Sequence, residues 1–232
     1  MTPREDAGAT ALIAYPQNAA VEWTMPKTQI YERRRPNAAL RRSFVAQVAQ
    51  ISWRYKLSPE TVNLPEVEGA REIQIFGVRL KNDSLGAQVL GCIDDAVPFP
   101  LVFELQRWEG DGAQTKVVAA YKRRHKFDDE KMSRSDYFET DWIPAGAPRS
   151  PMPRAEDMGD LYFALLRRIA GLSARSQETL PQFVERAVLA RRLRRKIQSV
   201  ESKMRKETQF NRKVEINRDL RRLIEQWRDL TQ

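Results

Sequence analysis

Apolar residues recur at helical spacing in several parts of the chain. After Pro36 and Asn37, residues 38–55 carry apolar side chains every three or four positions, and residues 155–170 show the same period. Asn82, Asp83 and Ser84 form a good helix start before a shorter amphipathic stretch that ends ahead of Pro98. These patterns predict three helices, each with one face toward a core.

Other segments follow the two-residue period of strands. Residues 72–80 alternate imperfectly between apolar and polar side chains, and residues 99–105 and 116–121 are mainly apolar runs that include β-branched valines. The last two runs are joined by a glycine-containing turn at 109–112, which favours a hairpin. Residues 137–143 predict one more strand. The order of these elements predicts an α+β fold with a small, mostly antiparallel sheet and covering helices.

Proline marks the expected domain boundary. Residues 144–153 contain four prolines among small residues, a composition that interrupts regular structure. We therefore predict an α+β head at residues 1–143, a linker at 144–153 and a helical C-terminal region at 154–232.

Residues 181–232, called the arm below, contain no glycine and, after Pro181, no proline. Two apolar stripes follow coiled-coil spacing along it, and the frame slips near 207–209. The slip fits either one long helix or an antiparallel helical hairpin, and we favour the hairpin because each stripe then buries against the other without a second chain. A homodimer through the arm is the other possibility. The stripe residues are Leu189, Leu193, Ile197, Val200 and Met204, then Phe210, Val214, Leu220, Leu223, Trp227 and Leu230.

Positive charge is concentrated in the arm. The chain has a net charge of +9, and residues 186–232 hold fifteen Lys and Arg against six Asp and Glu, an excess of nine. Cations outside the apolar stripes suit contacts with DNA phosphates, without reading of base sequence. The alternatives are a solvated coiled coil held by charge pairs and a protein-docking surface. The DNA-contacting residues that we predict are Arg191, Arg192, Arg194, Arg195, Lys196, Lys203, Arg205, Lys206, Arg212 and Lys213.

The residue types that carry chemistry are scarce. Cys92 is the one cysteine and His125 the one histidine, so a zinc site built from these residue types is excluded, and a reducing compartment is expected. No phosphate-binding loop, dinucleotide fingerprint, zinc-protease motif or nucleophile elbow occurs. No signal peptide or apolar membrane span is evident. The sequence therefore predicts a cytoplasmic protein without a cofactor or membrane association.

One acidic constellation keeps an enzymatic alternative open. Asp94, Asp95, Glu104 and Lys122 lie around the predicted hairpin, and restriction-type nucleases use such residues on adjacent strands to hold Mg²⁺ and activate water. Gln106 stands where such a motif has its lysine. The simpler interpretation is a surface pair of Glu104 and Lys122 across the hairpin.

Several sequence strings together resemble the bacterial family called domain of unknown function 4391, over roughly residues 13–230. They are WRYKLSPETVNL at 53–64, IQIF at 73–76, CIDDAVPFP at 92–100, AAYKR at 119–123, YFETDW at 137–142 and QFNRKVEIN at 209–217. The resemblance implies no reaction and no catalytic residue. It implies gene neighbours that encode DNA helicases and restriction-type DNA methyltransferases, and hence a role in phage defence.

The most economical hypothesis is a non-enzymatic accessory or scaffold subunit of a DNA-processing or anti-phage complex. Its head is expected to dock on a helicase or methyltransferase, and its arm to contact DNA or a partner helix. The divergent Mg²⁺-dependent nuclease subunit remains the alternative.

Overall fold

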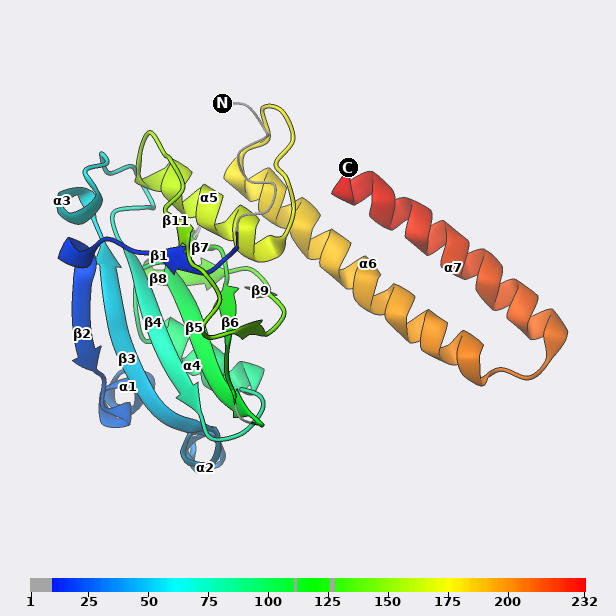
Figure 1. Cartoon of the computed structure of the whole chain (residues 1–232), viewed down its shortest axis with the longest axis horizontal. Coiled ribbons are helices and arrows are strands. Elements are labelled where there is room, and N and C mark those ends of the chain that lie inside the picture. Colours follow the sequence, from blue (N-terminus) through cyan, green and yellow to red (C-terminus); the bar gives the residue numbers. More distant parts are fainter. Residues whose placement is uncertain (1–9, 111, 126–127) are drawn as a thin grey trace. The chain divides into compact units, whose positions relative to one another are not determined.

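The computed structural model describes residues 10–110, 112–125 and 128–232, and the side chains of all of these except 124, 125 and 128–131. The chain divides into two compact units between Gly171 and Leu172. The first unit holds the β-sheet, and the second holds two long helices (Figure 1).

The first unit alternates short helices with strands. Its helical elements are η1 (Gln17–Ala19), α1 (Lys27–Arg34), α2 (Ala38–Gln47), α3 (Pro59–Val62), α4 (Ala87–Asp95) and α5 (Met158–Ala170). Its strands are β1 (Ile13–Ala14), β2 (Ala20–Thr24), β3 (Val48–Leu57), β4 (Ile73–Leu80), β5 (Leu101–Glu109), β6 (Gly112–Ala119), β7 (Lys122–His125), β8 (Asp128–Arg134), β9 (Phe138–Glu139), β10 (Ile143–Pro144) and β11 (Ser150–Pro151).

The main sheet is mixed and has the order β10-β6-β5-β4-β3-β2, with β9 also paired to β6. Neighbours pair antiparallel except for β4 and β5, which run parallel and are connected through α4. The predicted hairpin is present as β5 and β6, closed by the pair Glu109 and Gly112. The α+β class is confirmed.

The prediction of one helix over residues 38–55 is wrong for its second half, which is a β-strand. Asn37 starts α2 as predicted, because its side chain accepts a hydrogen bond from the Leu40 amide, but the helix ends at Gln47. Residues 48–57 form β3, which pairs with β2 on one side and β4 on the other. β-branched and aromatic side chains favour such a central strand, and two rows of backbone hydrogen bonds outweigh a short stretch of helical spacing.

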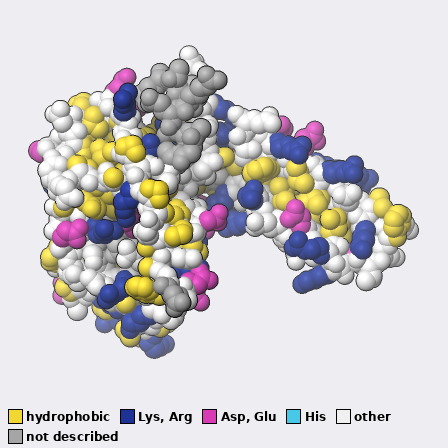
Figure 2. Space-filling model, viewed as in Figure 1, with side chains coloured by type: hydrophobic (Ala, Val, Ile, Leu, Met, Phe, Trp, Pro, Cys, Tyr) yellow, Lys and Arg dark blue, Asp and Glu magenta, His cyan; other side chains and the backbone are white. Residues whose placement is uncertain are grey.

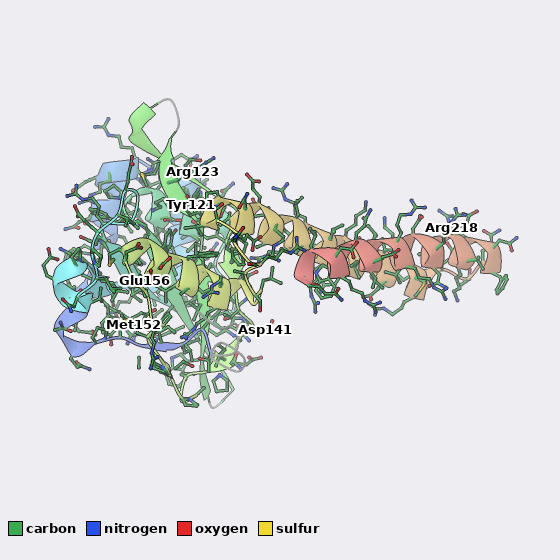
Figure 3. The ribbon with its side chains drawn as sticks, turned by 90° about the horizontal axis from the view of Figure 1, so that it is seen from above. Tyr121, Arg123, Asp141, Met152, Glu156 and Arg218 are labelled. Atoms are coloured by element: carbon green, nitrogen blue, oxygen red, sulfur yellow. The ribbon has the colours of Figure 1, made fainter. Side chains whose placement is uncertain are left out.

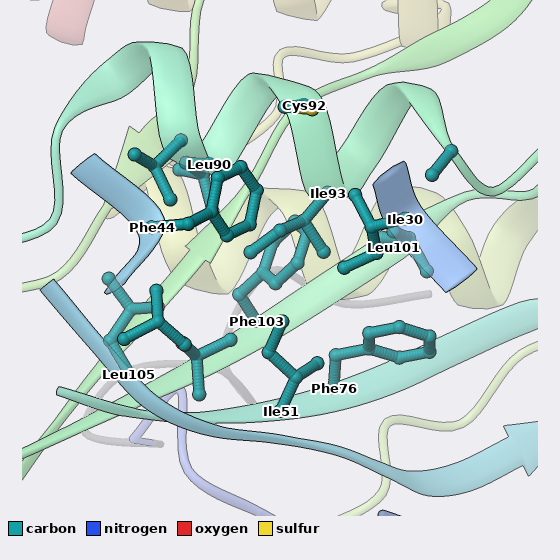
Figure 4. Close-up of a cluster of buried hydrophobic side chains, with 14 of the residues drawn as sticks. Ile30, Phe44, Ile51, Phe76, Leu90, Cys92, Ile93, Leu101, Phe103 and Leu105 are labelled. Atoms are coloured by element: carbon teal, nitrogen blue, oxygen red, sulfur yellow. The ribbon is translucent and has the colours of Figure 1, made fainter. Parts of the chain in front are cut away.

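The core of the first unit lies between α4 and one face of the sheet (Figure 4). Val89, Leu90 and Ile93 of α4 meet Phe103 and Leu105 of β5 there. Side chains alternate between the two faces of a strand, so the residues between these core positions point to the opposite face. The short pair β1 and β11 lies over that opposite face, in front of the sheet in Figure 1.

The proline-rich segment 144–153 belongs to the first unit. Pro144 lies in the edge strand β10 and Pro151 in β11, where the lack of an N–H does not interrupt a central ladder. The next helix, α5, contacts the end of β6: its Tyr162 hydroxyl donates to the carbonyl of Ala120, the residue after that strand. The unit boundary therefore falls after α5, where Gly171 ends the helix with a φ of +64°.

The second unit consists of α6 (Leu180–Lys206) and α7 (Phe210–Thr231), called the helical pair. Arg186 near the start of α6 reaches the Leu230 carbonyl near the end of α7, and Arg194 lies over the Trp227 ring. Farther along α6, Ile197 packs in one cluster with residues of the middle of α7. The two helices thus run in opposite directions, and the frame slip at 207–209 is the connection between them.

None of the helices in the described part of the chain combines the length and the apolar character that a membrane span requires.

Candidate functional site

Asp94 and Lys122 form a buried ion pair in the first unit. Asp94 is the penultimate residue of α4 and Lys122 begins β7, and each side chain is 2% exposed. The Lys122 ammonium contacts the Asp94 carboxylate and donates to the carbonyls of Asp94 at 2.8 Å and Val97 at 2.9 Å. A cation at the C-terminal end of a helix is favourable for the helix dipole. Lys122 therefore caps the C-terminal end of α4, and its ammonium group is bound by groups of the fold itself.

Two neighbours complete the surroundings of this pair. The Tyr137 hydroxyl donates to the Asp94 carboxylate at 2.7 Å, and Arg134 pairs with Asp95 at 3.1 Å. Burial lowers the pKa of Lys122 from its usual value, although Asp94 acts in the other direction. Burial also raises the pKa of Tyr137, and the adjacent Asp94 charge adds to that rise. The cluster is a set of mutually satisfied charges.

Glu104 lies on the opposite face of the sheet. Its neighbours Phe103 and Leu105 belong to the core under α4, so strand alternation directs Glu104 away from Asp94. Its side chain is 1% exposed and is held by two arginines. Arg149 binds both carboxylate oxygens, at 2.7 and 2.9 Å, and Arg54 contacts one of them at 2.5 Å.

The backbone makes room for this second cluster. Gly77 of β4 pairs with Glu104, and a Cβ at Gly77 would lie 2.8 Å from Arg54 Cδ. Arg149 also donates to the Ile13 carbonyl, which ties β1 to the cluster. The hydrogen bonds that Arg149 donates to the Glu104 carboxylate raise the pKa of Arg149. The geometry is that of an internal clamp between β1, the sheet and the segment before β11.

The four residues of the nuclease alternative are therefore not brought together. Asp94 and Lys122 lie on one face of the sheet, and Glu104 on the other. The expected surface pair of Glu104 and Lys122 is wrong as well, because both residues are buried with other partners. Among the side chains that the structure describes, no group of three or more His, Cys, Asp or Glu residues is arranged to hold a metal ion.

Cys92 is a residue of α4 and belongs to the core cluster, and burial raises the pKa of its thiol. A raised pKa keeps the thiol protonated, which lowers its nucleophilicity. The side chain of His125 lies outside the described residues, so the structure gives no geometry for a Cys–His pair.

The basic residues of the arm lie on the outside of the helical pair. Nine of the ten predicted DNA-contacting side chains are exposed, and Arg191 is intermediate. Figure 3 shows side chains, with Arg218 labelled among them, extending outward from the two helices. The buried exception among the arm's cations is Arg186. It binds both carboxylate oxygens of Glu178, at 2.6 and 2.7 Å, and donates to Ser173 and Leu230 carbonyls.

The apolar stripes of the arm are only partly buried. Ile197, Leu220 and Leu223 form the contact between the helices, with Leu193, Val200, Met204, Ile224 and Trp227 around them. Four predicted stripe residues lie outside it: Leu230 is half-buried, whereas Leu189 is 51%, Phe210 76% and Val214 54% exposed. The pair therefore leaves apolar side chains uncovered at the connection between its helices.

Sequence reasoning missed the partners that define both clusters of the first unit. Arg54 and Arg149 are 95 positions apart and meet only because β3 and the segment before β11 both approach β5. Tyr137 and Arg134 come from the region after β7. The signal that could have found one of them was Glu104 itself, because a glutamate inside a buried strand requires a cationic partner.

The model of the family described as domain of unknown function DUF4391 matches residues 13–226. No curated protein and no solved structure matches the chain. Because the family match spans nearly all of the sequence, including both clusters and most of the helical pair, the protein belongs to the DUF4391 family.

Proposed function

We propose that the protein is a non-enzymatic accessory subunit of a DNA-processing or anti-phage defence complex, and that its helical pair contacts DNA without sequence preference. The observation that carries the proposal is the contrast between the two units. In the first unit, Asp94 pairs with Lys122 and Glu104 pairs with Arg149 inside the fold. In the second unit, the excess cations lie on the outer surface.

The helical pair suits phosphate contacts rather than base readout. Arg192, Arg194, Arg195 and Lys196 lie within little more than one turn of α6, and all four are exposed. Closely spaced cations displace the counterions condensed on DNA, which yields affinity that does not depend on base sequence. The apolar contact between α6 and α7 is made by Ile197, Leu220 and Leu223, and Arg194 lies over the Trp227 ring beside it; because all four cations are nevertheless exposed, contact with DNA requires no rearrangement of the pair.

The first unit is the part that we assign to protein docking. Trp108, near the tip of the β5–β6 hairpin, is 68% exposed, and Val45 is 57% exposed. Exposed tryptophan is common at the centres of protein interfaces. The partner that we propose is a DNA helicase or a restriction-type DNA methyltransferase, which the family resemblance implies.

The direct test is binding of the full chain to fluorescent duplexes of equal length and unrelated sequence. We expect dissociation constants that agree within about threefold at low salt, because phosphate contacts carry no sequence information. Absence of binding, or a preference above about tenfold for one sequence, would contradict the proposal.

The non-enzymatic part has its own test. Because Glu104 lies away from Asp94 and Lys122, incubation of DNA with the protein and Mg²⁺ or Mn²⁺ should give no cleavage above that of an Asp95→Ala, Glu104→Ala variant. Because Glu104 also holds two arginines inside the fold, only cleavage that the double variant abolishes while its circular dichroism shows a folded protein would establish the nuclease alternative instead.

A further inference from the structure

At the connection between α6 and α7, an exposed aromatic side chain is surrounded by cations. Phe210 is the first residue of α7 and is 76% exposed. Val214 lies one turn later and is 54% exposed. Figure 2 shows hydrophobic and basic side chains gathered at this end of the helical pair. We call Phe210, Val214 and the exposed cations around them the tip; these cations are Lys203, Arg205, Lys206, Arg212 and Lys213.

The helical pair cannot cover the tip by itself. Val214 precedes Leu223 by nine residues, which is two and a half helical turns, so Val214 lies on the opposite side of α7 from that buried contact residue. Phe210 directly follows the short connection that ends at Gln209. Its ring is thus presented at the extremity of the pair. Turning it inward would require a different path for the connection.

The charges of the tip argue against a second copy as the occupant. Five cations stand against two carboxylates, Glu207 and Glu215, in this part of the chain. Glu207 is already engaged, because it pairs with Arg212 at 3.4 Å and accepts hydrogen bonds from the Thr208 and Gln209 amides. Two tips meeting on their apolar side chains would bring like charges together without compensation. A polyanion meets no such repulsion.

Only one class of polyanion also offers a flat apolar surface to Phe210. Within a duplex, away from its ends, the faces of the bases are stacked on one another, and a protein that approaches from outside meets phosphates and groove edges. An unpaired base exposes its face, and stacking of such bases on aromatic side chains next to a positive surface is how single strands are commonly held.

We infer that the tip binds unpaired nucleotides, as in a single strand or a gap beside a duplex, by stacking of Phe210 on a base while the surrounding cations hold the phosphates. The inference rests on the proposed function and specifies the DNA structure for it. Val214 extends the apolar surface beside the ring, and the cations farther along α6 hold the adjoining duplex.

The experiment compares three fluorescent DNA probes with the full chain: a blunt duplex, the same duplex with an internal thymine gap, and a thymine oligonucleotide. We expect the gapped probe to bind more tightly than the blunt one. Phe210→Ala should weaken binding of the gapped probe by about fivefold or more, the effect of losing one base–aromatic stack, and should leave the blunt duplex nearly unchanged. Phe210→Trp should retain the preference.

Leu189→Ala is the matched control, because Leu189 is also apolar and exposed but lies in the first part of α6, away from the tip. It should leave all three affinities unchanged. A 2-aminopurine placed in the gap adds a spectroscopic readout, since stacking on Phe210 changes its fluorescence and Phe210→Ala should remove that change.

The outcomes separate the inference from the proposed function. Equal binding of gapped and blunt probes, or equal weakening of both by Phe210→Ala, overturns the inference and leaves the general DNA contact in place. A parent protein that is dimeric, with Phe210→Ala monomeric and unchanged in DNA binding, identifies the tip as a self-association surface and also overturns it. If the parent protein binds none of the three DNA probes, the proposed function itself is rejected.

Discussion

At the scale of single residues, two buried ion pairs of the first unit each have one structural role. Lys122 closes the end of α4 with Asp94, and Arg149 fastens β1 to the sheet through Glu104. A buried ion pair contributes little compared with an apolar replacement, but removing one partner leaves an uncompensated charge in the interior. These residues are therefore needed for folding.

Replacing Lys122 with methionine tests this account of the α4 cluster. The substitution leaves the Asp94 carboxylate buried without its cation, so we expect a loss of about 3 to 5 kcal/mol in the free energy of unfolding, measured by urea denaturation. A Lys122→Met, Asp94→Asn variant should recover a large part of that loss, because no buried charge remains unpaired. A single variant as stable as the parent would show that the pair is not structurally important.

At the scale of elements, the helical pair is closed by contacts at two places. Ile197, Leu220 and Leu223 supply the apolar contact, and Arg186 joins the start of α6 to Glu178 and to the end of α7. The hydrogen bonds from Arg186 lower the pKa of Glu178 from its usual 4.5. A carboxyl group with a lowered pKa stabilises the folded state above that usual value, and the contribution is lost as the pH falls through the lowered pKa.

The helical pair should accordingly lose stability in acid. Thermal unfolding of the parent, followed by circular dichroism, should show a falling midpoint as the pH drops below about 4.5. Glu178→Gln should be less stable at neutral pH and should have a shallower acid dependence, because the titrating partner of Arg186 is gone. The exposed Glu185→Gln serves as the control and should keep the slope of the parent.

The closed pair also makes a distance prediction for the protein in solution. In a Cys92→Ala background, spin labels at Leu189 and Asp229 should lie within about 20 Å, two helix diameters. In one continuous helix these positions would be about 60 Å apart, at 1.5 Å per residue. Dilution with unlabelled protein distinguishes distances within one chain from those in a homodimer. The longer distance would contradict the closed pair.

Local pattern was a good guide where an element buries one clear face. The strand at 73–80, the hairpin of β5 and β6 and the helix α5 follow directly from periodicity and turn residues. Local pattern failed at residues 48–57. The helical spacing there predicts a helix, but pairing with β2 and β4 makes the segment a strand. The prolines at 144–153 predict a linker, but the segment belongs to the first unit. Edge strands tolerate proline, and Tyr162 of α5 donates to the Ala120 carbonyl next to β6.

The charged clusters depended on contacts that no local pattern contains. The sequence places Asp94 and Lys122 in one candidate constellation with Glu104, but the face of the sheet on which each lies follows from strand alternation around β5 and from the path of α4. Arg54 and Arg149 come from opposite ends of the first unit. The charge of the arm, in contrast, was readable from composition alone, since surface cations need no partner to be exposed.

At the scale of the whole molecule, the two units divide the work that we propose. In the first unit Asp94, Lys122 and Glu104 are buried in ion pairs and Trp108 is the exposed side chain that we assign to a protein partner, whereas the second unit carries the excess of cations on its outer surface. Net charge by itself would attract any polyanion, so the location of the charge is the essential point. The central claim is that the cations of the helical pair, and not the total charge, hold DNA.

The salt dependence of duplex binding tests this claim most directly. Replacing Arg191, Arg192, Arg194 and Arg195 with glutamine removes up to four phosphate contacts and leaves Ile197, Leu220 and Leu223 in place, although Arg194 no longer lies over the Trp227 ring. At about −0.9 for each phosphate neutralised, the slope of log affinity against log salt should become shallower by as much as three or four units, with helicity unchanged by circular dichroism. A control with the same charge change in the first unit, at the exposed Arg35, Arg42, Arg79 and Arg123, should keep the slope of the parent. An unchanged slope in the helical-pair variant, or an equal change in both variants, would contradict the account.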